Sequence, residues 1–128
     1  MTRGQFSEGL AAAARVRRDE LLALADDLAL QNDVAVVDAP APGSVMLELD
    51  SSVGAFCFTE VVVTTARVRV ERAEGWGAVM GWDAEGALAS ALCDAAGGER
   101  ASALARQALA DESHQRIERM RAVAATKV

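Results

Sequence analysis

Residues 45–94 constrain the fold of this chain more than any other stretch, because strand and helix patterns follow one another there without a gap. Val45, Leu47 and Leu49 alternate with polar residues, which predicts a strand with one buried face. A longer strand is expected over residues 58–72. Its second half alternates cleanly, while its first half, at residues 61–63, is apolar on both sides. Both faces of the sheet are therefore expected to be covered there.

Glycines after this long strand predict a hairpin and a close packing contact. Residues 73–75 are expected to form the hairpin connection, because glycine suits a positive φ. In the returning strand Gly77 and Gly81 lie on one face, and aligned glycines permit close approach by a helix or by another chain. The opposite face carries larger side chains, namely Trp76, Ala78, Met80 and Trp82. Such a tryptophan face is more often core than interface, although tryptophan is enriched at interface anchors.

Two helical segments, residues 2–14 and 18–31, precede the strands, and the pattern leaves open whether a break separates them. In the second segment the apolar residues fall on one face: Leu21, Leu22, Ala25, Leu28 and Ala29. A short apolar run at residues 34–37 is followed by Pro40 and Pro42. Because proline cannot donate to the ladder of a central strand, these prolines indicate a connection between elements.

Two more helical segments follow the glycine-containing strand. Residues 84–96 are expected to form a helix that Asp83 caps and that ends at Gly97-Gly98. Residues 99–125 are helical again, with a joint near Asp111 left open. The apolar stripe of this last segment is Leu109, Ile117, Met120 and Ala124. The order of N-terminal helices, a small antiparallel sheet with a long hairpin, and C-terminal helices predicts the α+β class.

Composition limits the functions open to this chain. Its 128 residues suit a single domain. The net charge of −6 argues against nucleic-acid binding, which needs basic residues to neutralise phosphates. No apolar run is long enough to cross a membrane, and no targeting segment is evident, so a cytoplasmic protein is expected. Cys57 and Cys93 are expected to be free thiols, without a disulfide.

Residues suited to catalysis are scarce. His114 is the only histidine and lies in a charged helical segment, so we expect a solvated residue and neither a metal site nor a catalytic relay. The glycines at 75–81 have the wrong spacing for a phosphate loop. Arginines 15, 17 and 18 are expected to form a solvated helical face. Glu60 lies among apolar residues, so it is either exposed at a strand end or paired, for example with Arg67. No catalytic residue, metal site or cofactor is predicted.

The central block also carries the letters of a known family pattern: Phe56, Glu60, Thr64, Gly81, Asp83, Ala87, Asp94 and Ala95. In this the chain resembles the PhnG family, the small G subunit of bacterial carbon–phosphorus lyase. The resemblance implies a subunit that is no enzyme by itself and that assembles with H, I and J subunits. With I, H and the ATPase-like L subunit, it implies a part in replacing the adenine of ATP by methylphosphonate, the reaction of ribose 1-methylphosphonate 5-triphosphate synthase.

At five positions the chain departs from the family pattern. Thr59, Thr65, Trp82, Gly86 and Leu88 stand where glycine, arginine, arginine, histidine and glutamate are usual. The leading interpretation is a non-catalytic G-type subunit, and the alternative is a stand-alone scaffold domain without phosphonate chemistry. An independent small enzyme is the weakest alternative.

We expect the chain to form a homo- or hetero-oligomer. Val61, Val63, Gly77 and Trp82 are the candidates for its interface with another chain. The matched motif positions Phe56, Glu60, Thr64, Gly81, Asp83 and Asp94 are expected to serve fold or assembly.

Overall fold

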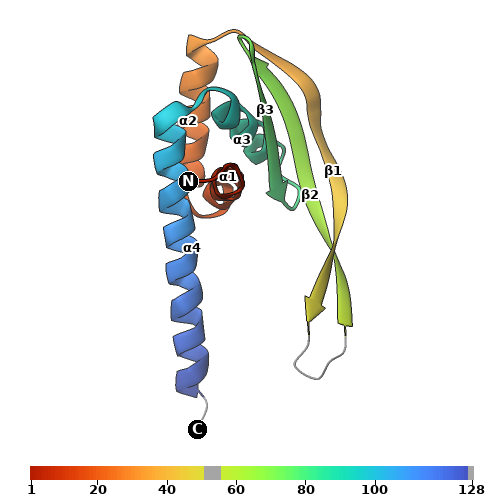
Figure 1. Cartoon of the computed structure of the whole chain (residues 1–128), viewed down its shortest axis with the longest axis vertical. Coiled ribbons are helices and arrows are strands. Elements are labelled where there is room, and N and C mark those ends of the chain that lie inside the picture. The colour runs from red at the N-terminus through yellow and green to blue at the C-terminus, as the bar shows by residue number, and fades with distance from the viewer. Residues whose placement is uncertain (51–55, 127–128) are drawn as a thin grey trace.

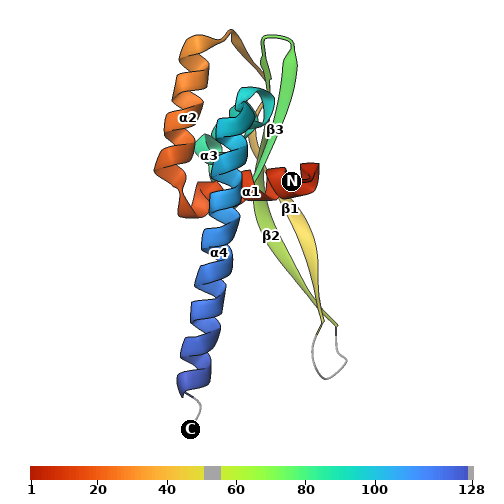
Figure 2. The ribbon, with the colours of Figure 1, turned by 60° about the vertical axis from the view of Figure 1, so that its left-hand side comes forward.

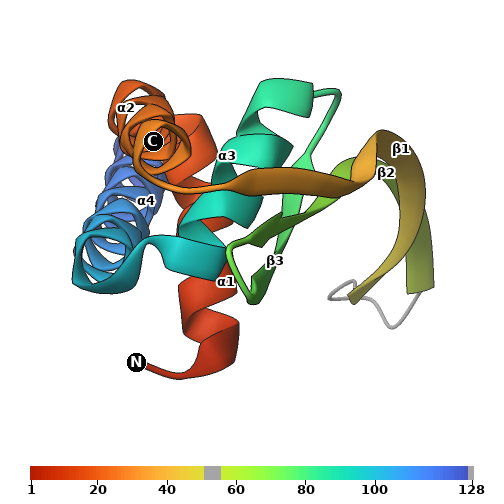
Figure 3. The same ribbon diagram turned by 90° about the horizontal axis from the view of Figure 1, so that it is seen from above.

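The chain forms helices, then a three-stranded antiparallel sheet, then helices, which confirms the α+β class. This computed structural model describes residues 1–50 and 56–126, with side chains described for residues 1–46 and 60–124. Its elements are α1 (Arg3–Val16), α2 (Arg18–Gln31), β1 (Val34–Asp50), β2 (Phe56–Val70), β3 (Ala73–Met80), α3 (Ala84–Ala96) and α4 (Gly98–Thr126). Seen from above, the sheet lies on one side, α1 and α3 in the middle, and α2 and α4 on the other side (Figure 3).

The sequence left open whether a break separates the first two helices. The structure has this break, at Arg17. This residue leaves the helical region of φ and ψ, while its N–H still closes α1 by donating to the Ala13 carbonyl at 2.9 Å. At the other end of α1, Thr2 and Gln5 cap each other's backbone N–H groups, which stabilises the first turn. The chain can therefore turn sharply and place α2 against α3.

The first strand contradicts one sequence-based prediction. Pro40 and Pro42 were expected to end the short run at residues 34–37, yet β1 continues through them to Asp50. The sheet order is β1-β2-β3, so β1 is an edge strand, and a missing proline N–H costs little on the side that faces away from β2. The register also shifts on both sides of Asp38, which gives the strand the irregularity that prolines require.

The hairpin between β2 and β3 turns two residues earlier than expected. Its connection is Glu71-Arg72, whereas Gly75 is a strand residue paired with Val68. Glu71 has a positive φ of 55°. Its conformation is supported by Asp33, whose N–H donates to the Glu71 carboxylate and whose carbonyl accepts the Glu71 N–H, both at 2.9 Å. Tertiary hydrogen bonds therefore place this turn.

The glycines of β3 instead allow α3 to pack directly on the sheet, which confirms the expected close approach by a helix. A Cβ atom at Gly75 would lie 2.0 Å from the Ala91 carbonyl oxygen, and one at Gly77 would lie 2.1 Å from that of Ala87. Gly77 therefore lies beneath a helix of its own chain, which removes it from the candidates for an interface with another chain.

On the opposite face of β3, the described part of the chain leaves the large side chains exposed. Trp76 is 52% exposed, Met80 56% and Trp82 74%, so the prediction that this face belongs to the core is wrong. The core lies on the α3 side and is built largely from alanines of α1, α3 and α4. Small side chains bring these helices close together, and Gly9 of α1 lies directly against Ala105 of α4.

The last helix, α4, is continuous from Gly98 to Thr126, without the joint considered near Asp111. Its residues up to Ala108 pack on the body, and from Ser113 to Ala124 every residue is exposed. Of the apolar stripe expected on this helix, only Leu109 is therefore even partly buried. Figures 1 and 2 show this end of α4 and the end of the β1–β2 hairpin projecting from the body in the same direction. Among the described residues, no helix has the length and apolarity needed to span a bilayer.

Candidate functional site

Three of the motif residues meet where the sheet passes into α3. The Thr64 side chain, fully buried in β2, donates its hydroxyl to the Gly81 carbonyl at 2.5 Å and accepts the Asp83 N–H at 3.0 Å. Gly81 takes a positive φ of 81° and donates its own N–H to the Val62 carbonyl at 2.7 Å. One threonine hydroxyl therefore fixes the loop that carries Asp83.

Asp83 joins this loop to two helices. Its Oδ1 accepts the Gly86 N–H at 2.9 Å, the N-cap bond expected from the sequence. Both carboxylate oxygens also bind the Arg18 guanidinium at the start of α2, at 2.5 and 2.7 Å. This bidentate pair holds the pKa of Asp83 below its ordinary value, and the Gly86 bond lowers it further, while partial burial opposes both. No pattern in the sequence indicated Arg18 as the partner of Asp83.

Gly86, at a position where the family resemblance implies histidine, allows this arrangement. A Cβ atom there would lie 2.2 Å from Oδ2 of Asp83 and 2.7 Å from its Cγ. Any side chain at residue 86 would therefore displace the carboxylate that Arg18 binds. Glycine in place of the family's histidine at residue 86 therefore leaves the room that the Asp83–Arg18 ion pair needs.

Asp94 lies apart from these residues, near the end of α3. Its Oδ2 accepts the backbone N–H of Trp76 at 2.9 Å and the Arg3 guanidinium at 3.0 Å, and its side chain is only 2% exposed. Asp94 therefore satisfies a backbone donor of the edge strand β3. The other oxygen, Oδ1, is buried without a hydrogen-bond partner among the described residues.

The remaining motif and interface residues are spread along the hairpin. Glu60 is exposed and pairs in register with Met46. Arg67, considered as its partner, instead contacts Asp38 at 3.0 Å. Val61 and Val63 are half-buried. Two further residues of the hairpin, Phe56 and Cys57, belong to β2, but their side chains lie outside the described residues.

The arginines of the α1–α2 junction pair with acidic residues. Arg15 binds Glu112 at 2.6 and 2.9 Å, and Arg17 binds Asp111 at 2.6 Å. Arg15 also lowers the pKa of Glu112. With Arg18 bound to Asp83, all three guanidinium groups bind carboxylates of distant parts of the chain. The cluster thus links helices, where the sequence suggested a solvated face.

Other potentially reactive groups are placed unfavourably for chemistry. Cys93 is a buried free thiol whose pKa burial raises to about 12, which keeps it protonated and unreactive at neutral pH. His114 is exposed on α4, with Nε2 at 3.1 Å from Glu118. Within the described part of the chain, no group of three or more histidine, cysteine or acidic residues is arranged to hold a metal ion. An open groove of about 420 Å³ between α2 and α4 is lined by Glu20, Leu24, Arg100 and Gln107, away from the motif residues.

The Asp83–Arg18 pair makes the stability of the fold depend on pH. Because the folded-state pKa of Asp83 is lowered, its contribution is fully present above the unfolded-state value of about 3.9 and is lost as the pH falls through the folded-state value. The free energy of unfolding of the wild type should exceed that of Asp83→Asn near neutral pH, and the difference should shrink in acid. Urea denaturation across this range measures it, with exposed Asp26→Asn as the control. A difference that stays constant down to about pH 3 would contradict the assignment.

The comparisons with known proteins agree with the motif. No curated protein matches this chain at a significant level. A family model described as phosphonate metabolism protein PhnG matches residues 3–128, which is nearly the whole chain. The match includes the residues that assemble around Thr64 and Asp83 as well as both terminal helices. The chain therefore belongs to the PhnG family and has a role in phosphonate metabolism.

Proposed function

We propose that this chain is a non-catalytic subunit of the carbon–phosphorus lyase system. It acts in the cytoplasm, assembled with H-, I- and J-type subunits, and supports the formation of ribose 1-methylphosphonate 5-triphosphate from ATP and methylphosphonate. The chain is one domain in this proposal, and it needs no metal or cofactor of its own.

One observation carries this proposal: the polar side chains retained from the family pattern already bind other groups of this same chain. The Thr64 hydroxyl and the Asp83 carboxylate bind backbone groups and Arg18. The Asp94 side chain is buried against β3 and Arg3. Groups held in this way position helices and loops, and a substrate would have to break the fold to reach them. The retained motif therefore supports a role in fold and assembly.

The test is reconstitution with the H, I and L subunits of the same organism. The isolated chain should release no adenine from ATP in the presence of methylphosphonate, because the side chains that the structure describes form no catalytic constellation. The full mixture should release adenine, and leaving this chain out should abolish the release. Leu30→Glu, an exposed change on α2, serves as the matched control and should support the reaction like the wild type.

Two results would count against the proposal. Sustained adenine release by the isolated chain would make it an enzyme. Unchanged release when the chain is left out would favour the alternative, a scaffold domain without phosphonate chemistry. The exposed Trp82, at a position where the family resemblance implies arginine, is the observation that favours this alternative, because an indole cannot replace a guanidinium in binding phosphate.

A further inference from the structure

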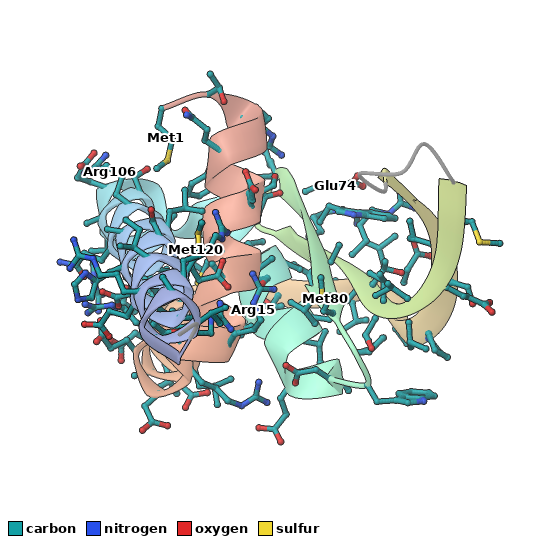
Figure 4. The ribbon with its side chains drawn as sticks, turned by 90° about the horizontal axis from the view of Figure 1, so that it is seen from below. Met1, Arg15, Glu74, Met80, Arg106 and Met120 are labelled. Atoms are coloured by element: carbon teal, nitrogen blue, oxygen red, sulfur yellow. The ribbon has the colours of Figure 1, made fainter. Side chains whose placement is uncertain are left out.

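The long helix α4 crosses α1 steeply. Figure 1 shows α1 end-on and α4 lengthwise, and Figure 4, seen from below, shows α4 end-on with α1 lengthwise beside it. The closest approach is between Gly9 of α1 and Ala105 of α4. Two helices that cross steeply touch over a short length, so this contact by itself would let α4 rotate about the crossing point.

A rotation at the crossing would be amplified at the end of α4. From Ala105 to Thr126 the helix extends for about 30 Å, at about 1.5 Å per residue. A rotation of about 10° would therefore move its tip by about 5 Å. Among the described side chains of α4, Glu112 is the last that is not exposed. The direction of the projecting end, Ser113–Thr126, is therefore set by contacts that α4 makes before it.

Hydrogen bonds from two arginines hold α4 beyond the crossing. Arg15, in the last turn of α1, donates through Nε and Nη2 to the two carboxylate oxygens of Glu112, at 2.6 and 2.9 Å. Arg17, at the break between α1 and α2, donates to Asp111 at 2.6 Å and to Gln107 at 3.3 Å. Both ion pairs thus join α4 to the α1–α2 junction, about 10 Å along the helix from the crossing.

The geometry of the two ion pairs suits them to fix a direction. Successive residues of a helix point about 100° apart around its axis, so Asp111 and Glu112 restrain α4 in two different directions. A bidentate arginine–carboxylate pair also fixes the relative orientation of its two groups. The pairs are partly shielded from solvent, because the side chains of Glu112 and Arg17 are 22% and 28% exposed. Salt therefore screens them less than fully exposed pairs.

We propose that Arg15 and Arg17 are positioning residues, which by binding Glu112 and Asp111 fix the direction in which the end of α4 projects. An element held in one direction loses less conformational freedom when another chain binds it. The inference rests on the proposed function only for this use in assembly, since the direction itself is a property of the isolated chain. The test below needs no other subunit and no phosphonate, so its failure would leave the proposed function standing.

The test measures the distance between two spin labels in the full chain by pulsed electron spin resonance. Ser7→Cys on α1 and Ala122→Cys on the end of α4 introduce two exposed thiols for the labels. Cys57→Ser removes a third thiol, and Cys93 stays unlabelled because it is buried and its pKa is raised to about 12. Dilution with unlabelled chain restricts the signal to distances within one molecule.

The otherwise unchanged chain should give a narrow distribution of distances. Arg15→Gln combined with Arg17→Gln should broaden this distribution by at least about 5 Å, the displacement of the tip for a rotation of about 10°. Arg106→Gln is the matched control. Arg106 binds Glu99 at 3.0 Å, but both residues belong to α4, so their ion pair joins no second element. The control should keep the narrow distribution.

Exchange of the charges gives the sharper test. Arg15→Glu alone and Glu112→Arg alone should each broaden the distribution, because each places like charges against one another. The two changes together should narrow it again, since they restore an ion pair between the same two positions. A general loss of stability would not be repaired in this way.

Three outcomes would overturn the proposal. A narrow distribution in the variant with both Arg15→Gln and Arg17→Gln would mean that apolar packing alone fixes the direction of α4. A distribution that stays broad after the charge exchange would mean that the ion pair does not set it. Helix content, measured by circular dichroism, should be the same in all variants. A loss of helix content in step with the broadening would show that the arginines maintain the helix and do not direct it.

Discussion

Replacing Gly77 by alanine is expected to destabilise this protein by at least about 3 kcal/mol, enough to unfold much of it. The added Cβ would lie 2.1 Å from the carbonyl oxygen of Ala87 and 2.8 Å from the backbone nitrogen of Ala91. Both atoms belong to the backbone of α3 and cannot rotate away. The helix would have to lift off β3, which would open the contact between the sheet and the core. Thermal and urea unfolding of the purified variant measure the loss.

Gly43→Ala is the matched control for Gly77→Ala. Gly43 lies in the same sheet, on the edge strand β1. A Cβ atom added to Gly43 would lie 4.0 Å from the nearest heavy atom, the carbonyl oxygen of Val63. We expect no loss there, since alanine is favoured over glycine in a strand where space permits. If Gly77→Ala unfolds like Gly43→Ala, the close packing of α3 on β3 described above is wrong.

Asp83→Ala is expected to lower the free energy of unfolding by about 2–3 kcal/mol, more than the loss of a helix cap alone. The substitution removes the N-cap bond to Gly86, which contributes about 1 kcal/mol. It also removes the charge-assisted bidentate bond to Arg18. Because Arg18 is partly exposed, solvent screening reduces the contribution of this second bond to stability. Asp83→Asn separates the two effects, because asparagine caps a helix well but carries no charge. It should lose about half as much stability.

A double-mutant cycle with Arg18→Ala isolates the ion pair. Since the two side chains contact each other directly, we expect a coupling free energy of about 1–2 kcal/mol. The pair of Arg3→Ala with Asp83→Ala, whose side chains have separate partners, should be additive. A different outcome would change the assignment of Asp83: if Asp83→Ala melts and assembles like the wild type yet abolishes adenine release in the reconstituted system, the residue belongs to an active site.

Local patterns in the sequence were sufficient for much of the fold. The ends of α3 were predicted from the residues that flank it, because Asp83 precedes the apolar helical segment and two glycines follow that segment. The observed ends, Ala84 and Ala96, are those predicted. The glycines of β3 predicted a close approach by a helix, because only glycine leaves room for backbone against backbone. Helical periodicity and strand alternation act between neighbours in the chain, so they can be recognised without knowing the tertiary structure.

Predictions failed where a distant contact decided the outcome. Pro40 and Pro42 are tolerated because β1 is an edge strand, and strand order is not a property of the strand's own residues. The β2–β3 turn lies at Glu71 because Asp33 binds both its backbone and its side chain. Trp76 shares a face with other apolar residues, as core residues do, yet α3 packs on the opposite face of the sheet.

The candidate site shows the same division. Residue type and spacing in the sequence by themselves determined that Asp83 begins a helix, and the family resemblance placed Thr64 and Gly81 in one pattern. Only the tertiary structure decided that the Thr64 hydroxyl fixes the Asp83 loop and that Arg18, far earlier in the chain, binds the Asp83 carboxylate. The physical reason is that an ion pair depends on where two charged groups meet in space. That meeting is fixed by the break at Arg17 and by the packing of α2 on α3, which no pattern local to Asp83 contains.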